Sequence, residues 1–205
     1  NTSNDSLISI VLNDWNNAFS DKNTPLARRF SDEFYRGFHL AKTTERGNTT
    51  ILNLTDSDNA ALGWERTAKN PDYIVVKLNR KLRPGEKIDL HLTYISKIPS
   101  DKFTRYGFDQ NGGMNLKNWF LSPARFENHR FIKYDNFNLD DIANASTDYE
   151  VEIKIPNQYS ITTDLNSVSD DLTNTAYKTY SFSGKNRTDF NLFIEKQNSF
   201  RSYEI

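Results

Sequence analysis

The residues with the clearest capacity for chemistry lie in the segment NWFLSPARFENHRF, residues 118–131. Glu127 and His129 are two positions apart, a spacing that places both side chains on one face of a β-strand. A carboxylate and an imidazole so placed could be two ligands of a metal ion, but a zinc site needs at least a third, which no spacing supplies. We therefore predict no metal site in this chain and interpret the pair as part of a solvated strand edge.

The histidines form no recognised zinc-hydrolase motif. Such a motif, His-Glu-x-x-His on a helix, puts two imidazoles on one face with the glutamate beside the bound water. Here His39 falls in a predicted helix, His91 on the polar face of a predicted strand, and His129 in the segment above. The sequence also lacks a Gly-x-Ser-x-Gly elbow, a phosphate-binding Gly-Lys-Ser/Thr loop and any cysteine. We assign no catalytic residue to this chain.

The stretch DSDNAALG, which starts at Asp56, begins like a calcium loop with oxygen-bearing side chains at its first and third positions. Ala61 stands where such a loop needs glycine, and Thr67 stands where a bidentate glutamate should close it. We interpret this stretch as a surface turn.

One short helix, near residues 25–38, is expected among the elements that would position these side chains. Thr24 can cap it and Pro25 suits its first turn. Apolar residues then recur at every fourth position, which is the spacing of a helix face directed at a core. They are Leu26, Phe30, Phe34 and Phe38, and we predict that all four are buried.

Most of the remaining chain alternates apolar and polar residues, which predicts β-strands. The clearest run is YEVEIKI, residues 149–155, which Pro156 ends. Further strands are expected at LISIVL near the N-terminus and at residues 49–54, 73–78, 88–94, 177–182 and 190–194, with a turn at residues 183–186 between the last two. We predict a mainly β fold in which packed antiparallel sheets form a saddle or sandwich, as a single domain over residues 1–205.

Charge and hydropathy exclude two classes of partner. With 26 Lys and Arg against 27 Asp and Glu, and no stretch of one sign, the chain offers no basic face for nucleic acid. No apolar run approaches the roughly 20 residues that span a bilayer. The absence of cysteine leaves the compartment open. Of the possible compartments we favour the periplasm or cell envelope over the cytoplasm.

Four stretches occur in a familiar order: LRPGEKIDLHLTY (82–94), RYG (105–107) leading to NLKNWFLSPARF (115–126), STDYEVEIKIPNQY (146–159) and KTYSFSGKNRTDFNLFI (178–194). Together they resemble the N-terminal β-domain of M1-family zinc aminopeptidases. The earlier stretch DWNNAFSDKNTPLARRF (14–30) resembles a segment of the bacterial members in which an Asn-rich turn precedes a helix.

The resemblance implies a saddle of β-sheets without zinc ligands, packed on a separate thermolysin-like catalytic domain. In that family the zinc ligands, the general base and the Gly-x-Met-Glu-Asn motif follow later in the chain, and this chain stops at Ile205, about where the catalytic domain would begin. The implied function is that of a non-catalytic N-terminal domain that covers and shapes the substrate cleft of a downstream zinc aminopeptidase domain. Peptide would be the substrate of the parent enzyme, zinc would belong to its catalytic domain, and this chain would hold no cofactor.

In many members of the family the β-domain also contributes one substrate-binding side chain, a Gln. This Gln stands two residues before an acidic residue, and an Ala-Arg pair follows shortly after. Setting Ala124-Arg125 on that pair puts Asn118 at the Gln position and Phe120 at the acid. Asn keeps the amide, whereas Phe keeps no acceptor, and the family's Phe-Pro-Cys-x-Asp-Glu-Pro loop is replaced by residues 126–131. Asn118 is therefore the implied substrate-binding residue, and its alternative is a strand-end residue packed at a domain interface.

Two other functions stay open from the residues alone. A carbohydrate-binding β-sandwich, or another protein-interaction module, would suit the many aromatic, Asn and Asp residues, and it would require coplanar exposed aromatic side chains with amides beside them. A self-contained hydrolase would require carboxylates that converge from separate strands, as in glycoside hydrolysis. Sequence does not fix which acidic residues approach one another.

Overall fold

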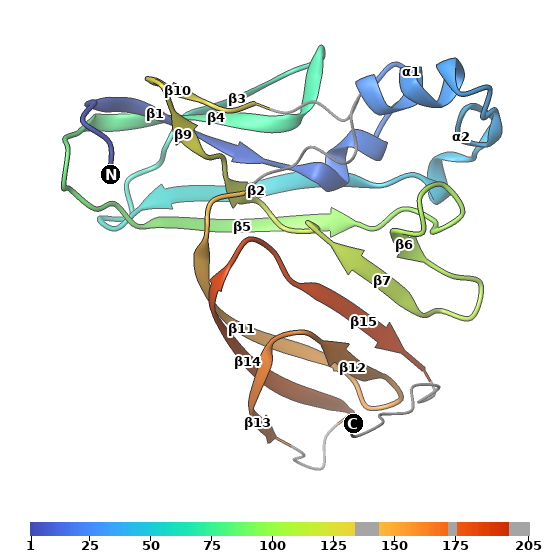
Figure 1. The fold of residues 1–205 in the computed structure, drawn as a ribbon. Coiled ribbons are helices and arrows are strands. Elements are labelled where there is room, and N and C mark those ends of the chain that lie inside the picture. The colour runs from blue at the N-terminus through green and yellow to red at the C-terminus, as the bar shows by residue number, and fades with distance from the viewer. Residues whose placement is uncertain (134–143, 172–175, 197–205) are drawn as a thin grey trace. The chain divides into compact units, whose positions relative to one another are not determined.

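The computed structural model describes residues 1–133, 144–171 and 176–196. These described residues are mainly β, with 49% strand, 11% helix and several antiparallel sheets that form no closed barrel among them, so the predicted fold class is confirmed (Figure 1). Its contacts group the chain into two compact units, each of which we describe by itself. The first unit comprises Asn1–Pro99 and Asn118–Ala145, and the second comprises Ser100–Lys117 and Ser146–Ile205. A single domain over residues 1–205 stays a prediction.

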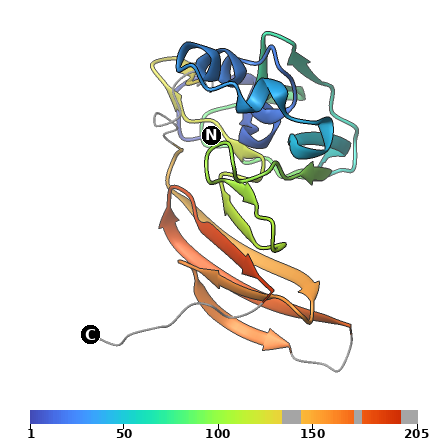
Figure 2. The same cartoon turned by 90° about the vertical axis from the view of Figure 1, so that its right-hand side faces the viewer.

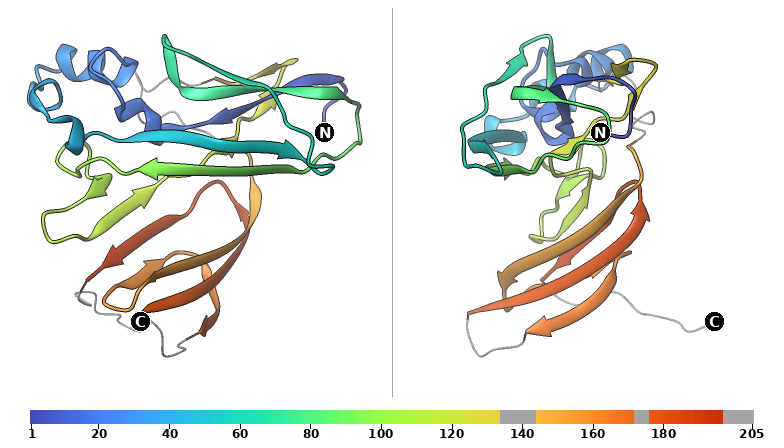
Figure 3. Two further views of the ribbon diagram at one scale, coloured as in Figure 1. Left: turned by 180° about the vertical axis from the view of Figure 1, so that it is seen from behind. Right: turned by 90° about the vertical axis from the view of Figure 1, so that its left-hand side faces the viewer.

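The described part of the first unit contains a sheet of strand order β3-β4-β1-β8, the pair β2-β5 and the short hairpin β9-β10, all antiparallel. Figure 3 shows β2 and β5 side by side along most of their length. The strands are β1 (Leu7–Asn13), β2 (Asn48–Asp56), β3 (Trp64–Thr67), β4 (Asn70–Leu82), β5 (Leu90–Lys97), β8 (Ser122–Pro123), β9 (Phe126–Glu127) and β10 (Arg130–Phe131).

One face of the β3-β4-β1-β8 sheet packs against the β2-β5 pair to form a core of the first unit. The buried members of this core are Leu12, Leu54, Leu62, Ile74 and Val76. Because neighbours along a strand point to opposite faces, Val11 and its cross-strand partner Val75 lie on the outer face of the same sheet. The first unit therefore has an apolar core on one side of this sheet and a second surface on the other.

The helical part of the first unit begins as predicted. Thr24 Oγ1 accepts a hydrogen bond from the Ala27 amide at 3.2 Å, and Pro25 occupies the first helical position. Figure 2 shows the short helices in blue. They are the 3-10 helix η1 (Trp15–Phe19), α1 (Pro25–Asp32), α2 (Gly37–Leu40) and the 3-10 helix η2 (Thr43–Glu45).

Phe34 divides the predicted helix into two. Its φ of 59° is left-handed, a conformation that bulky side chains rarely adopt and that ends a helix. The turn carries its side chain away from the core, so that 90% of Phe34 is exposed, whereas Leu26, Phe30 and Phe38 are buried as predicted. The predicted burial of Phe34 is therefore wrong.

The described residues of the second unit form two antiparallel sheets, of order β11-β14-β13 and β12-β15-β7-β6. In β11 the predicted alternation is confirmed, because its apolar residues are at least half-buried and the charged residues between them are exposed. The strands are β6 (Gly107–Phe108), β7 (Met114–Lys117), β11 (Thr147–Pro156), β12 (Ser160–Thr163), β13 (Asn166–Asp171), β14 (Tyr177–Arg187) and β15 (Asn191–Glu195).

The predicted turn at residues 183–186 is wrong, because β14 runs through it. A Cβ atom on Gly184 would come within 2.5 Å of Leu165 Cδ2, so this glycine serves close side-chain packing within a strand. Asn186 has a φ of 53° at a register shift between β11 and β14, and its amide donates to Asp148 Oδ1 at 3.0 Å. The residues that suggested a turn therefore mark a β-bulge.

Phe34 and Phe38 give a matched pair for testing this packing. Phe38→Ala should lower the free energy of unfolding by about 3–5 kcal/mol, because its fully buried ring packs on Phe19 and Phe30. Phe34→Ala should change it by less than about 0.5 kcal/mol, because the side chain is exposed. Urea denaturation of both variants measures the difference, and equal losses would contradict this packing.

Candidate functional site

Residues 118–131 fold as a series of short connections. Asn118 has a left-handed φ of 50°. The two residues of β8 then pair with Leu12 and Asn13 of β1, and the Ala124 amide donates to the Val11 carbonyl at 2.9 Å. The predicted role of this segment as a connection between strands agrees with that path.

The hairpin β9-β10 separates Glu127 from His129. Its two turn residues, Asn128 and His129, have φ values of 49° and 64°, the left-handed pair that a two-residue hairpin turn requires. Glu127 ends one strand and His129 belongs to the turn, so the two side chains do not share a strand face. The predicted strand geometry of this pair is wrong.

Glu127 and His129 also have different partners. Glu127 Oε1 lies 3.1 Å from Arg125 Nε, and His129 Nδ1 lies 2.8 Å from Asp5 Oδ2. Within residues 1–133, 144–171 and 176–196, no three His, Cys, Asp or Glu side chains gather into a group that could hold a metal ion.

The stretch that begins at Asp56 folds back on this residue. The carboxylate oxygen Oδ1 of Asp56 accepts hydrogen bonds from the amides of Asp58 and Ala60 at 3.1 and 3.0 Å. This confirms the predicted surface turn.

Ser31 and His39 approach each other in the way a nucleophile and a general base would, with 2.8 Å between Ser31 Oγ and His39 Nε2. His39 Nε2 also lies 3.0 Å from the Ala27 carbonyl oxygen. Because a carbonyl can only accept, this nitrogen carries the proton and donates to Ala27. It therefore has no lone pair with which to activate the serine, and the pair links α2 to α1.

Asn118 lies at the end of a chain of side-chain amides. Asn13 Nδ2 donates to Asn144 Oδ1 at 3.2 Å, and Asn144 Nδ2 donates to Asn118 Oδ1 at 3.1 Å. These bonds orient the side-chain carbonyl group of Asn118. The left-handed backbone at Asn118 is one that Asn tolerates better than Gln or most other residues.

Tyr94 connects β5 to the same segment, because its hydroxyl oxygen accepts a hydrogen bond from the Leu121 amide at 3.3 Å. Burial raises the pKa of the Tyr94 hydroxyl above its usual 10.0, and the charge of Asp14 acts in the same direction, against the lowering effect of the Leu121 hydrogen bond.

A buried polar network centred on Asp14 was not predicted from the sequence. Asp14 is 2% exposed at the end of β1, and its Oδ2 lies 2.6 Å from Arg66 Nη2 of β3. Its Oδ1 accepts from the Thr49 hydroxyl of β2 at 2.7 Å and from the Asn17 amide of η1 at 3.3 Å. One carboxylate thus joins three strands and a helix of the first unit.

An apolar surface patch, formed by Phe34 and Leu40, also escaped prediction. The two side chains are 90% and 81% exposed, and both line a hollow of about 360 Å³ beside α1 and α2. The phenylalanines occur at every fourth position, which is the period of a helix face, so this spacing predicted that Phe34 is buried and gave no indication of an exposed patch. The one sequence signal is Gly37, three residues later, where a helix former would be expected if the helix continued.

The other exposed aromatic side chains are scattered. Among the described residues they are Trp64 on β3 and Tyr177 on β14, 40% and 48% exposed. They lie on separate elements from Phe34 and give no support to the coplanar platform that a carbohydrate-binding module would require. The helices described here are also too short to cross a membrane, since α1, the longest, has eight residues.

The same fold occurs in solved structures of an M1 zinc metallopeptidase from Deinococcus radiodurans. One structure of that enzyme matches with a TM-score of 0.51 and 17% identity over 93% of this chain and 34% of that chain. A mutant of it bound to the substrate Tyr-Ser-Ala matches with a TM-score of 0.52 and 18% identity, over 93% and 35%. The predicted resemblance is thereby confirmed at the level of the fold.

The present chain spans about a third of the length of these solved structures. Comparison of its sequence with models of known protein families gives no match. No curated protein matches it either.

The stability of the chain should fall as the pH rises above about 10, because the hydroxyls of Tyr94 and Tyr149 both have raised pKa values from burial. Between the unfolded and folded pKa values the unfolded state has lost protons that the folded state keeps, so unfolding is favoured as pH increases. Tyr94→Phe should reduce this decline. Urea denaturation between about pH 9 and pH 11 measures it, and an unchanged slope in the variant would contradict the assignment.

Proposed function

We propose that this chain is the non-catalytic N-terminal β-domain of a bacterial M1-type zinc aminopeptidase. In this proposal it covers and shapes the substrate cleft of a catalytic domain that follows in the same polypeptide. The observation that carries the proposal is the fold likeness, which extends over 93% of this chain but only 34% of the Deinococcus enzyme. Such coverage is that of one module within a larger peptidase.

Zinc and peptide hydrolysis belong, in this proposal, to the catalytic domain. The described residues supply no three clustered ligands for zinc, and their histidines are directed at Asp5 and Ala27 or lie exposed on β5. No step of hydrolysis is therefore assigned to this chain. Its contribution would be to exclude water and to limit the peptides that reach the cleft.

The patch formed by Phe34 and Leu40 is the surface we assign to docking on the catalytic domain. An exposed Phe is unfavourable in water, and a left-handed backbone at a bulky residue adds strain. Folding alone does not account for a residue with both disadvantages. Contact of its ring with a second domain would supply the missing burial.

The first test of the proposal is the coding sequence beyond residue 205. We expect it to encode His-Glu-x-x-His with a further Glu downstream, the ligands and general base of a zinc peptidase. A stop codon at position 206 would overturn the proposal and favour an interaction module.

A double variant tests the docking surface. Phe34→Gly with Leu40→Ser should leave the isolated chain at least as stable, because both side chains are exposed and glycine accepts the left-handed backbone. Its affinity for the separately produced catalytic domain should fall by about tenfold or more, the effect of losing an apolar anchor. Calorimetric titration measures this, with Val168→Ser, 64% exposed on β13, as the matched control. Unchanged affinity in the double variant would place docking elsewhere.

Asn118 is the residue we propose to bind the amino terminus of the substrate. Asn118→Gly in the full-length enzyme keeps the left-handed backbone and removes the amide, so KM for peptides with a free amino terminus should rise about tenfold, the value of a hydrogen bond to a charged group. Asn118→Asp retains the acceptor and should stay close to the original KM. An unchanged KM in the glycine variant would leave Asn118 a packing role only.

A further inference from the structure

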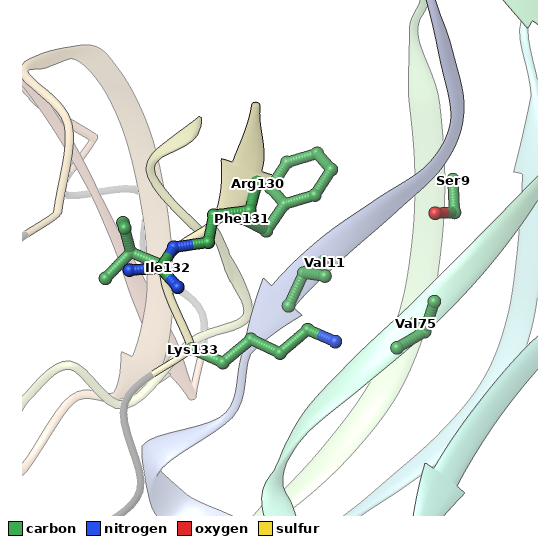
Figure 4. Close-up of a pocket in the computed structure, with 7 residues that line it drawn as sticks. All are labelled: Ser9, Val11, Val75, Arg130, Phe131, Ile132 and Lys133. Carbon is green, nitrogen blue, oxygen red and sulfur yellow. The ribbon is translucent and has the colours of Figure 1, made fainter. Parts of the chain in front are cut away.

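A groove lies on the outer face of the β3-β4-β1-β8 sheet, opposite the core of the first unit (Figure 4). Its volume is about 520 Å³, within the usual range for small-molecule sites. The groove is lined by side chains of β1, of β4 and of the chain at and after β10. They include Ser9, Val11, Val75, Arg130, Phe131 and Lys133.

The floor of the groove is apolar. Val11 of β1 and Val75 of β4 are cross-strand partners, so their side chains stand next to each other on one face of the sheet. Val11 is only 1% exposed although it lies on the outer face, so other side chains cover the sheet at this point. The half-buried ring of Phe131 adds an aromatic wall. An apolar group that enters the groove would therefore leave water and contact these three side chains.

Lys133 brings a positive charge to this apolar floor. Figure 4 shows its side chain reaching across the groove, with the ammonium group toward Val11 and Val75. Its Nζ lies 5.3 Å from the centroid of the Tyr73 ring, a contact with the ring face that attracts the charge but does not neutralise it. No carboxylate of the described residues forms an ion pair with Lys133. The groove therefore presents an unpaired cation beside two valine side chains.

The other cations near the groove are paired or turned away from its floor. Lys77, on the same face of the sheet, is paired with Glu65 at 3.2 Å. Figure 4 shows the guanidinium group of Arg130 turned toward Ile132. Of the described residues that line the groove, Lys133 is thus the one whose charge faces the valines. One uncompensated positive charge suits a ligand that carries one negative charge.

Ser9 adds a neutral hydrogen-bonding group to the lining. It is half-buried and lies two residues before Val11 on β1, so the two side chains are on the same face of the sheet. Its hydroxyl group has no hydrogen-bond partner within the described residues, and it can donate to a carboxylate oxygen. An apolar floor with a cation and a hydroxyl group beside it has the composition of a small-molecule site.

We propose that this groove binds a small monocarboxylate with an apolar body, of the kind represented by a medium-chain aliphatic acid. The carboxylate would pair with Lys133, and the hydrocarbon would lie on Val11 and Val75 against the ring of Phe131. All four side chains line the same hollow, so one ligand can contact them together. The inference does not depend on the aminopeptidase assignment, because it rests on the first unit alone.

The probe for this site is octanoate, with neutral octanamide and cationic octylammonium for comparison. The 205-residue chain should bind octanoate about twofold to fivefold more tightly than octanamide, the usual effect of an exposed ion pair, and more tightly still than octylammonium. Affinity should fall by up to about fourfold for each methylene removed from the acid. Titrations followed by NMR measure these affinities. Absence of binding, or equal affinity for the three probes, would overturn the proposal.

Two variants that each remove one positive charge locate the carboxylate. Lys133→Gln should abolish the preference for octanoate over octanamide, whereas Arg130→Gln should keep it, because the Arg130 side chain is turned away from the floor. Both residues are exposed, so the thermal unfolding of both variants should match that of the parent chain. Retention of the preference by Lys133→Gln, or its loss in Arg130→Gln, would overturn the site.

The same titrations locate the hydrocarbon, because the patch formed by Phe34 and Leu40 is a second apolar surface of this unit. Octanoate should shift the amide resonances of Ser9, Val11 and Val75 and leave those of residues 33–41 in place. The double variant Phe34→Gly with Leu40→Ser should bind octanoate as tightly as the parent chain. Shifts confined to residues 33–41, or loss of binding in the double variant, would place the ligand on the patch and overturn the groove.

Discussion

The carboxylate of Asp14 is the interaction on which the rest of the first unit depends. A charge at 2% exposure is costly unless it is paired and hydrogen-bonded, and Asp14 reaches its partners only when the end of β1, β2, β3 and η1 are all in place. The nearby residues Asn16 and Asn17 add further hydrogen bonds between η1 and neighbouring strands. Asn16, which is fully buried, donates to the carbonyls of Asn48 and Lys97, and Asn17 donates to that of Pro71.

This network determines where the candidate functional surfaces lie. The chain continues from this network through η1 into α1. Because the network fixes η1, it also fixes the position of Phe19, on which Phe38 packs, and the start of the segment that turns outward at Phe34. In the other direction, β1 runs back toward Leu7 paired to β4, and among the described residues β8 pairs with only the last two residues of β1 on its other edge. A polar core at one end of β1 thereby fixes the start of the helical segment that carries the apolar patch formed by Phe34 and Leu40.

Sequence patterns were reliable where a single physical requirement decided the structure. The alternation in β11 and the cap at Thr24 are examples, because burial of one face and satisfaction of free amides leave few alternatives. The patterns failed at Phe34, where the helix period continued but the backbone did not. They failed again at Gly184, whose absent Cβ makes room for Leu165, a residue 19 positions away in sequence. The sequence also placed Glu127 and His129 on one strand, and only the three-dimensional path of the hairpin separates them.

The proposed function rests on the likeness of the fold to an M1 zinc metallopeptidase. Two local sites, at Asn118 and at the patch formed by Phe34 and Leu40, have roles in it. The described residues offer a hydrogen-bonded amide at Asn118 and an exposed aromatic patch, but no clustered metal ligands. The amide and the patch are the two features to which we assign substrate binding and docking in the proposed function. The Asp14 network would give such a module the rigidity to hold a docking surface in place.

Amide hydrogen exchange measured on the full-length polypeptide and on the 205-residue chain is the most direct test of this central claim. If the chain docks on a catalytic domain through Phe34 and Leu40, amides in residues 33–41 should exchange more slowly in the full-length protein, while those of β11 in the second unit, which is remote in sequence from this patch, should serve as an internal reference. Identical exchange of residues 33–41 in the two proteins would contradict it.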